Sequence, residues 1–425
     1  MKFNCLENKK SKIPNVWHKQ DFGYDLNGCH EKVGLMKKIL VFTSLFGEPF
    51  FGGAEATVFE YYKSLAEEPY QIVVCTLDKK YSNKFYQEFS NLHLKRFSTR
   101  LPHPVMERNQ TNFVIKAFLH ILNMSIGLRP LTVAKEFRRL KPNLVITHNL
   151  SGWGMFPWIM CRAMRIPLVH DNHDFYLKCF KTTMWKSKQG VCKKTCKSCI
   201  PRSFATKFFW GGGLMLTNSL FLQKSIRQVL TRQVHTDYEI IYPPVKISRQ
   251  SIKSSEIRYD AVFIGRLEES KGITEFLNAT NFSNYKIAVG GVGELMAQLK
   301  KDFPAVDFLG QVDSFDLMAK SRLVVVPSKW NETFGRVVLE GVAMGLPVLH
   351  SSRGALGEFK NRRGATLIEI NPEDLIDLAS KIKSTLQLEK NVHQVESKWL
   401  EEHYEVQITK FKALVNDLLK SDKNA

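Results

Sequence analysis

Two glutamates separated by seven residues are the most informative chemical feature of the sequence. Glu332 and Glu340 lie in the segment 327–347, PSKWNETFGRVVLEGVAMGLP, which follows the apolar run 322–327. This pattern predicts a loop and then a helix that begins near Thr333, whose free backbone N–H groups and dipole would suit a phosphate. Gly335 would let a ligand approach the backbone, and Glu340 could accept hydrogen bonds from paired sugar hydroxyls. For either glutamate alone, a capped helix with solvated carboxylates explains the pattern equally well.

Two cations five residues apart follow another short apolar run. Arg266 and Lys271 lie in the segment 265–272, GRLEESKG. A departing nucleoside diphosphate accumulates negative charge, so cations at this place would stabilise the transition state more than the ground state. By themselves, an Arg and a Lys after a strand are more often surface charges. The glutamate pair favours the functional interpretation.

The first half places small and titratable residues after its predicted strands. Gly52 and Gly53 precede a helical run from 56 to 66, where adjacent glycines would let a phosphate or sugar touch the backbone. A flexible loop is the alternative. In the segment 169–176, VHDNHDFY, His173 could orient a substrate and hydrogen-bond to sugar oxygens. His148 and His170 are equally capable chemically.

Together these motifs resemble glycosyltransferase family 4 over about residues 37–370, most strongly in the second half. The resemblance implies that Glu332 contacts hydroxyls of the transferred sugar and that Glu340 contacts the ribose. It also implies that Arg266 and Lys271 hold the diphosphate and that His173 lies beside the donor sugar. The catalytic residues are then His173, Glu332, Arg266 and Lys271. The residues that bind the nucleotide sugar are Gly52, Gly53, Gly265, Arg266, Lys271, Thr333, Phe334, Gly335 and Glu340.

The resemblance further implies a GT-B architecture, in which two Rossmann-like doubly wound α/β domains face a central cleft, and retention of anomeric configuration. Retention could use a carboxylate nucleophile, for which Asp171 and Asp174 are candidates. The family is usually described instead by a same-face path in which the leaving phosphate takes the acceptor's proton. Neither route needs a metal, and the sequence has no Asp-x-Asp motif that would offer oxygen ligands for one. We therefore expect no catalytic metal and no cofactor beyond the nucleotide diphosphate sugar.

Four of the eight cysteines lie together in a basic insertion, 178–207. They are Cys179, Cys192, Cys196 and Cys199. Four thiolates can complete a structural zinc site, although zinc-ribbon spacing needs two close pairs and only the last two cysteines form one. Reduced thiols and a labile disulfide are the alternatives. The lysines and Trp185 of the insertion could meet lipid headgroups or the phosphate of a lipid-linked acceptor, or the insertion could simply cap the cleft.

Short apolar runs alternate with helix-like stretches, which predicts two parallel α/β sheets. The expected strands are 39–45, 71–77, 143–147, 166–170 and 214–218 in the first half, and 260–265, 286–290, 306–309, 322–327 and 347–351 in the second. A chain of 425 residues is also long enough for two cores. The expected organisation is a tail or mis-assigned start, 1–35; an acceptor-side domain, 36–245; a donor-binding domain, 246–395; and a final helix, 396–425.

Excess positive charge is confined to the first half of a chain whose formal net charge is +20. Residues 1–250 contain 38 Lys and Arg against 17 Asp and Glu, whereas residues 251–425 contain 23 against 24. This asymmetry predicts an anionic partner such as a membrane surface or a phosphate-linked substrate, with a solvated basic surface as the alternative. The sequence carries no nucleic-acid-binding motif, and we expect no nucleic-acid partner.

No stretch reaches the roughly 18 apolar residues of a membrane span, and the first 35 residues lack the apolar core of a signal peptide. We therefore expect a cytoplasmic enzyme, at most peripheral at the membrane. The predicted function is retaining transfer of a hexose-type unit to a glycan or lipid-linked glycan in cell-envelope polysaccharide or glycolipid synthesis. A GT-B nucleotide-sugar epimerase would instead convert the donor without an acceptor. A non-catalytic membrane- or glycan-binding protein would bind the donor without turnover.

Overall fold

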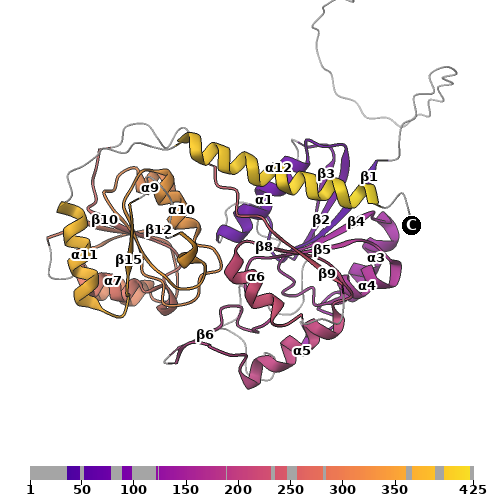
Figure 1. The fold of residues 1–425 in the computed structure, drawn as a ribbon, viewed down its shortest axis with the longest axis horizontal. Coiled ribbons are helices and arrows are strands. Elements are labelled where there is room, and N and C mark those ends of the chain that lie inside the picture. Colours follow the sequence, from indigo (N-terminus) through magenta and orange to yellow (C-terminus); the bar gives the residue numbers. More distant parts are fainter. Residues whose placement is uncertain are drawn as a thin grey trace, which may run out of the picture. The chain divides into compact units, whose positions relative to one another are not determined.

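A computed structural model describes most of the chain and contains two parallel β-sheets (Figure 1). The described residues are 36–47, 52–77, 89–97, 121–122, 124–187, 189–230, 235–246, 256–280, 284–359, 366–387 and 397–421. The expected tail, 1–35, lies outside them. None of the described helices is long and apolar enough to cross a membrane.

The first sheet has seven parallel strands in the order β3-β2-β1-β4-β5-β8-β9. Its strands are β1 Lys37–Phe42, β2 Tyr70–Thr76, β3 Leu92–Arg96, β4 Leu144–Thr147, β5 Leu168–Asn172, β8 Gly213–Thr217 and β9 Thr236–Ile240. The helices between them are α1 Gly53–Leu65, α3 Pro130–Leu140, α4 Phe156–Met164, α5 Ile200–Phe209 and α6 Leu220–Arg227. The strand order reverses between β1 and β4, where Ile39 pairs with Ile72 on one side and Leu144 on the other.

The second sheet has six parallel strands in the order β12-β11-β10-β13-β14-β15. Its strands are β10 Ala261–Ile264, β11 Ile287–Gly290, β12 Asp307–Gly310, β13 Val324–Val326, β14 Val348–Ser351 and β15 Leu367–Ile370. Its helices are α7 Ile273–Thr280, α8 Met296–Asp302, α9 Ser314–Met318, α10 Arg336–Ala343 and α11 Leu375–Gln387. The strand order reverses between β10 and β13. Ligands of doubly wound sheets bind at the carboxyl ends of the strands beside such a reversal.

Both sheets are covered on their two faces, as the continuous apolar runs of parallel strands require. In β1, Leu40 and Phe42 belong to one buried cluster, whereas Ile39 and Val41 belong to another. In the second sheet, one cluster contains Val262, Val324 and Val348 and the other contains Ala261, Phe263 and Val325. All ten expected strands are present.

The last helix, α12 Ser397–Ser421, packs mainly against the first sheet's layer and also touches α10 of the second. Its buried residues Ile408, Phe411 and Val415 join the same cluster as Ile39. The Phe411 ring stacks on Tyr61 of α1 at a centroid distance of 4.1 Å (Figure 1 shows α12 beside α1). The chain therefore returns from the second sheet to complete the first core.

Three strands of the two large sheets were not expected from the sequence: β3, β9 and β15. All three are edge strands, and each has at most one fully buried residue. The first sheet ends at Ile240 and the second begins at Ala261, an interval that contains the expected domain boundary near residue 245. The basic insertion forms a small hairpin, β6 Trp185–Lys186 with β7 Gly190–Val191, followed by a single turn at Lys197–Cys199 and α5.

Candidate active site

A cleft of about 1630 Å³ runs along the carboxyl ends of strands from both sheets. This volume exceeds the roughly 300–1,000 Å³ of a typical small-molecule pocket and leaves room for two substrates. Every residue predicted for the site lines it: Gly52, Gly53, His173, Gly265, Arg266, Lys271, Glu332, Thr333, Phe334, Gly335 and Glu340. Motifs spread over nearly 300 positions of the sequence therefore converge on one cavity.

Lys271 and Glu332 form an ion pair in the wall of the cleft. The Lys271 ammonium lies 2.7 Å from Glu332 Oε1, and the Ser328 hydroxyl donates to the same oxygen at 2.5 Å. Burial alone would raise the pKa of Glu332, but Lys271 holds it below its usual value. Burial lowers the pKa of Lys271, and Glu332 opposes that effect. Trp330 lies under the ammonium, with its ring centroid 4.6 Å away.

Arg266 is the more accessible of the two predicted diphosphate-binding cations. Its side chain is 48% exposed, and its guanidinium is held by Glu268 Oε1 at 2.5 Å. A residue held in this way keeps donors available to a ligand because a guanidinium offers five N–H groups. Arg266 and Lys271 thus line the cleft from the loop after β10, as the sequence predicts.

Glu340 is buried and is held by Arg336, a residue that the sequence analysis did not single out. The Arg336 Nε donates to Glu340 Oε1 at 2.7 Å, one helical turn away. The Arg336 side chain also packs over Gly53, where an added Cβ would lie 3.0 Å from Arg336 Cδ. The only sequence signal for Arg336 is its position four residues before a glutamate, a spacing that favours ion pairs on any helix.

Helix α10 begins at Arg336, three residues later than the expected start near Thr333. Gly335 precedes it with φ +102°, a left-handed conformation that ends the loop and turns the chain into the helix. An added Cβ at Gly335 would lie 2.2 Å from Leu356 Cδ2, so the position also lacks space for a side chain.

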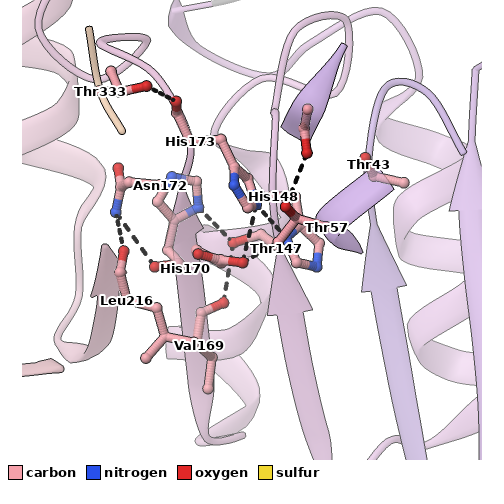
Figure 2. A network of polar contacts seen from close by, with 12 residues as sticks. Thr43, Thr57, Thr147, His148, Val169, His170, Asn172, His173, Leu216 and Thr333 are labelled. Carbon is pink, nitrogen blue, oxygen red and sulfur yellow. Dashed lines mark hydrogen bonds and ion pairs between the residues drawn. The ribbon is translucent and has the colours of Figure 1, made fainter. Parts of the chain in front are cut away.

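Thr333 and Phe334 are engaged mainly by the protein itself. The Thr333 hydroxyl donates to the His173 carbonyl at 2.8 Å (Figure 2), and the Thr333 carbonyl accepts from the Ser219 hydroxyl at 2.6 Å. The Phe334 ring is buried against Tyr242 and Phe359. These two residues therefore join the loop 327–335 to the strand ends of the first sheet. Sequence reasoning missed Ser219 because its pattern is that of an ordinary N-cap, which it also is.

His173 belongs to a buried polar cluster at the ends of β4 and β5. Its Nε2 lies 3.0 Å from Asp171 Oδ2, and His148 Nδ1 lies 3.2 Å from the same oxygen. Burial would raise the pKa of Asp171, but the two imidazoles hold it well below its usual range. Asp171 in turn raises the pKa of His173 against the effect of burial, whereas burial lowers the pKa of His148. Figure 2 shows the two imidazoles side by side.

The other titratable residues of this region differ in role. His170 hydrogen-bonds to Thr147 at 2.8 Å, and burial lowers its pKa to about 3, so it is a neutral structural residue. Asp174 and Glu55 both line the cleft. Burial raises the pKa of Asp174 to about 6 and also raises the pKa of Glu55. Two carboxyl groups with raised pKa values therefore face the first-sheet side of the cavity.

The basic insertion forms part of the cleft wall. Lys181, Trp185 and Arg202 line the cavity. Ser187 donates to Glu269 at 2.6 Å in the loop that carries Lys271. These contacts agree with an insertion that caps the cleft.

The four cysteines give no support to the zinc hypothesis. Cys179 and Cys199 have sulfur atoms 3.7 Å apart, but the four thiols do not gather closely enough to share an ion. All four are free thiols. A hydrogen bond with Ser198 lowers the pKa of Cys196 to about 7, whereas burial raises that of Cys199 to about 12.

Family models and relatives account for both halves of the chain. A model described as Glycosyltransferase Family 4 matches residues 51–249, and a model described as Glycosyl transferases group 1 matches residues 258–387. The chain is 32% identical over 289 residues to D-rhamnosyltransferase WbpZ of Pseudomonas aeruginosa, an alignment that covers 64% of this chain and 71% of WbpZ. The chain belongs to glycosyltransferase family 4. This glycosyltransferase is also 24% identical over 346 residues to an uncharacterized 42.6 kDa protein in the cps region of Klebsiella pneumoniae, which covers 76% of this chain and 87% of that protein.

Solved structures confirm the fold of this glycosyltransferase. A glycosyltransferase from Rickettsia africae superposes with a TM-score of 0.62 at 13% identity, covering 92% of this chain and 100% of that one. Anabaena HepE in complex with UDP and glucose superposes with a TM-score of 0.61 at 17% identity, covering 91% and 100%. The predicted GT-B architecture of two Rossmann-like sheets is therefore correct.

Proposed function

We propose that this glycosyltransferase moves a hexose-type unit, with retention of configuration, from a nucleotide diphosphate sugar to a hydroxyl of a glycan or lipid-linked glycan. The observation that carries the proposal is the Lys271–Glu332 ion pair beside Arg266 in a cleft that both sheets line. In such a pair the cation can bind the diphosphate of a nucleotide sugar, and the carboxylate can bind the hydroxyls of the adjoining sugar. The names of relatives, a D-rhamnosyltransferase and a protein in a cps region, support a role in cell-envelope polysaccharide or glycolipid synthesis.

In the proposed reaction, Arg266 and Lys271 neutralise charge on the diphosphate as the bond between the anomeric carbon and the phosphate oxygen breaks. The acceptor oxygen forms its bond to the anomeric carbon on the same face, and its proton passes to the departing phosphate. Glu332 accepts hydrogen bonds from sugar hydroxyls, and Glu340, held by Arg336, accepts them from the ribose. Atoms and charge balance without a further reactant.

Two observations favour this path over a carboxylate nucleophile. Asp171 is 4% exposed and occupied by two imidazoles, so it has no free approach to an anomeric carbon. Asp174 lines the cleft, but its Oδ1 accepts the backbone N–H of Tyr176 at 2.7 Å and its Oδ2 lies 3.5 Å from Asn149 Nδ2, so both oxygens are already engaged. Asp174 is better suited to accept a hydrogen bond from the acceptor.

A donor panel followed by an acceptor screen tests the proposal. Thermal shift with UDP-, GDP- and ADP-sugars should identify a donor that stabilises the protein, and that donor should be consumed only when an acceptor is present. Conversion of the donor without an acceptor would indicate an epimerase instead. Binding without turnover across a broad acceptor panel, or no stabilisation by any nucleotide sugar, would contradict the proposed function.

We also propose that the enzyme works at an anionic membrane surface through α5. Three apolar side chains four positions apart on this helix are strongly exposed: Ile200 at 54%, Phe204 at 66% and Phe208 at 63%. Exposed lysines lie next to this stripe in the chain, at 193, 194, 197 and 207. An apolar stripe with neighbouring cations fits a helix that lies in the plane of an anionic interface. The net charge of the first half supports the same partner.

Vesicle sedimentation tests the membrane proposal. Phe204→Ser with Phe208→Ser should reduce binding to vesicles that contain phosphatidylglycerol, and pure phosphatidylcholine vesicles should bind the wild type weakly. Ile376→Ser is a matched control, because Ile376 is 85% exposed on α11 of the second sheet. Equal sedimentation of the α5 double variant and the control would refute the proposal.

A further inference from the structure

The hairpin of the basic insertion places an aromatic ring, Trp185, in the wall of the cleft. The residue is half-buried, so part of its apolar surface stays accessible from the cavity. Covering exposed aromatic surface with a ligand is favourable, because apolar area is then removed from water. Trp185 belongs to none of the motifs on which the family resemblance depends, and the proposed transfer gives it no role.

The backbone that leads into Trp185 adopts an unusual conformation. Thr182 and Met184 have φ of +63° and +49°, in the left-handed region that non-glycine residues rarely occupy, and Thr182 is β-branched. Two other non-glycine residues in the described parts of the chain have positive φ, Lys141 and Arg165, and both end helices, where this conformation is common. Backbone strain persists only where the surrounding structure fixes it, and it concentrates at ligand-binding segments.

Hydrogen bonds hold this segment on the first-sheet side of the cleft. The backbone N–H of Phe175 donates to the Thr182 carbonyl at 3.1 Å, and the backbone N–H of Cys192 donates to the Met184 carbonyl at 2.8 Å. Phe175 lies in the chain just after the end of β5 and two residues after His173. The loop that carries Trp185 is therefore anchored to the segment that follows His173.

Contacts with loops of the second sheet fix the ring from the other side. The Lys329 ammonium lies over the Trp185 ring, 5.8 Å from its centroid, and Lys329 is itself held by Glu275 at 2.5 Å. The hydroxyl of Ser187, two residues further along the hairpin, donates to Glu269 at 2.6 Å. A ring that is held in place before a ligand arrives loses little freedom on binding, so more of the contact energy contributes to affinity.

The polar residues that share this cavity suit a saccharide. Asp174, Lys181 and Thr183 line it together with Trp185. A pyranose has a face of C–H groups and a rim of hydroxyls. The C–H face suits an aromatic ring, whose face carries partial negative charge, and the hydroxyls suit a carboxylate. A lipid chain in the same place would take water from the carboxyl group of Asp174 without giving it a partner, which is unfavourable.

We propose that Trp185 is the platform on which a pyranose ring of the acceptor lies, with Asp174 accepting a hydrogen bond from one of its hydroxyls. This inference rests on the proposed function and narrows its substrate class, because it requires an acceptor that presents a sugar ring and not a bare lipid phosphate. Lys271 and Glu332, which are assigned to the donor, come from the second sheet, whereas Trp185 comes from the insertion in the first. The two substrates therefore approach from different walls of the cleft.

Fluorine NMR tests the platform without turnover. The seven tryptophans would be replaced by 5-fluorotryptophan, and the Trp185 signal is the one that Trp185→Phe lacks. Methyl α- and β-pyranosides of glucose, galactose, mannose, rhamnose and N-acetylglucosamine would be added, alone and with UDP or GDP present. At least one glycoside should shift the Trp185 signal saturably, whereas the signals of Trp158 and Trp210, which are buried outside the cavity, should not move.

Glycerol at the same concentrations is the control ligand, because it has hydroxyls but no ring face, and it should leave the Trp185 signal unchanged. The proposal is overturned if no glycoside shifts that signal, if glycerol shifts it equally, or if only the signal of Trp330, beside Lys271, responds.

Kinetics of variants then separate the acceptor from the donor. The glycoside that shifts the Trp185 signal would be the acceptor, with the donor identified by thermal shift. Trp185→Ala should raise KM for the glycoside by about tenfold and KM for the donor by less than about twofold, and Trp185→Phe should keep both within about threefold of the wild type. Gln189→Ala is the matched control, because Gln189 is exposed in the turn of the same hairpin and does not line the cavity.

Equal changes of the two KM values in Trp185→Ala, or no change in either, would overturn the proposal. The fluorine titration uses no nucleotide sugar. A wild type that transfers no sugar would therefore contradict the proposed function, and the titration would still decide whether Trp185 binds a sugar ring.

Discussion

Replacing Glu332 by Gln keeps the shape of the side chain and removes the charge that holds Lys271. The exposed fractions of the two side chains are 11% and 17%, so the substitution leaves a largely buried cation unpaired. Removing one partner of a buried ion pair costs about 3–5 kcal/mol. The amide oxygen can still accept from Ser328, which lies 2.5 Å away, so we expect the free energy of unfolding to fall by about 2–4 kcal/mol near pH 7. Urea unfolding measures this as a lower midpoint at unchanged slope.

The difference in the free energy of unfolding between the wild type and Glu332→Gln should depend on pH in a defined direction. The pKa of Glu332 is lowered in the folded protein, so its contribution is present above the unfolded value of about 4.3 and is lost as the pH falls through the folded value. Without Glu332, the pKa of Lys271 falls further, and the variant gains stability as the pH rises and Lys271 loses its proton. The difference in the free energy of unfolding should therefore be largest near neutral pH and should decrease at both lower and higher pH.

Glu275→Gln separates stability from donor binding. Glu275 pairs with Lys329 at 2.5 Å, with exposed fractions of 20% and 15%, yet neither residue lines the cleft. Both substitutions should destabilise the protein, but only Glu332→Gln should lower kcat/KM, by about 10–150-fold for one lost charged hydrogen bond of 1.5–3 kcal/mol. Equal kcat/KM for the two variants would refute the assigned role of Glu332, and a flat pH profile of their stability difference would refute the ion-pair reasoning.

Three further predictions concern other parts of the structure. Gly335→Ala should lower the free energy of unfolding by at least about 2 kcal/mol, because φ is +102° and a Cβ would meet Leu356; a melting temperature equal to wild type would contradict this. Phe411→Ala should cost about 3–5 kcal/mol in urea unfolding, since the buried ring stacks on Tyr61, and a loss below 1 kcal/mol would show that α12 does not complete the core. Cys196, with a pKa of about 7, should react fastest with iodoacetamide among the described cysteines, with a rate that rises between pH 6 and 8; mass spectrometry that finds another described thiol labelled first would exclude it.

The sequence predicts the central strands of both sheets because each is an apolar run buried on two faces. Runs such as 71–77 and 322–327 contain few polar residues and are bounded by turn residues. The edge strands β3, β9 and β15 have at most one fully buried residue each, so they do not stand out from loops. The packing of α12 on the first sheet cannot be predicted from the sequence either, because the amphipathic pattern of a helix does not indicate which sheet it packs against.

The donor motif is predictable because its residues are close together in the sequence and of unusual types. The contacts that join the two halves of the chain cannot be predicted in this way. Ser219, Arg336 and Glu358 resemble ordinary capping and helix-surface residues, and only the fold brings Glu358 to the backbone N–H groups that begin α6. The contact of His148 with Asp171 likewise depends on the register of β4 against β5, which the sequence does not specify.

Calorimetry with nucleotide sugars tests the central claim most directly. The wild type should bind at least one UDP-, GDP- or ADP-sugar with a Kd in the range of about 1 μM to 1 mM typical of enzyme substrates. Replacing both Arg266 and Lys271 by Met should weaken that binding by about 100-fold or more, since each lost charged hydrogen bond is worth about 1.5–3 kcal/mol. Equal affinity of the double variant and the wild type, or a folded wild type that binds no nucleotide sugar, would contradict the account.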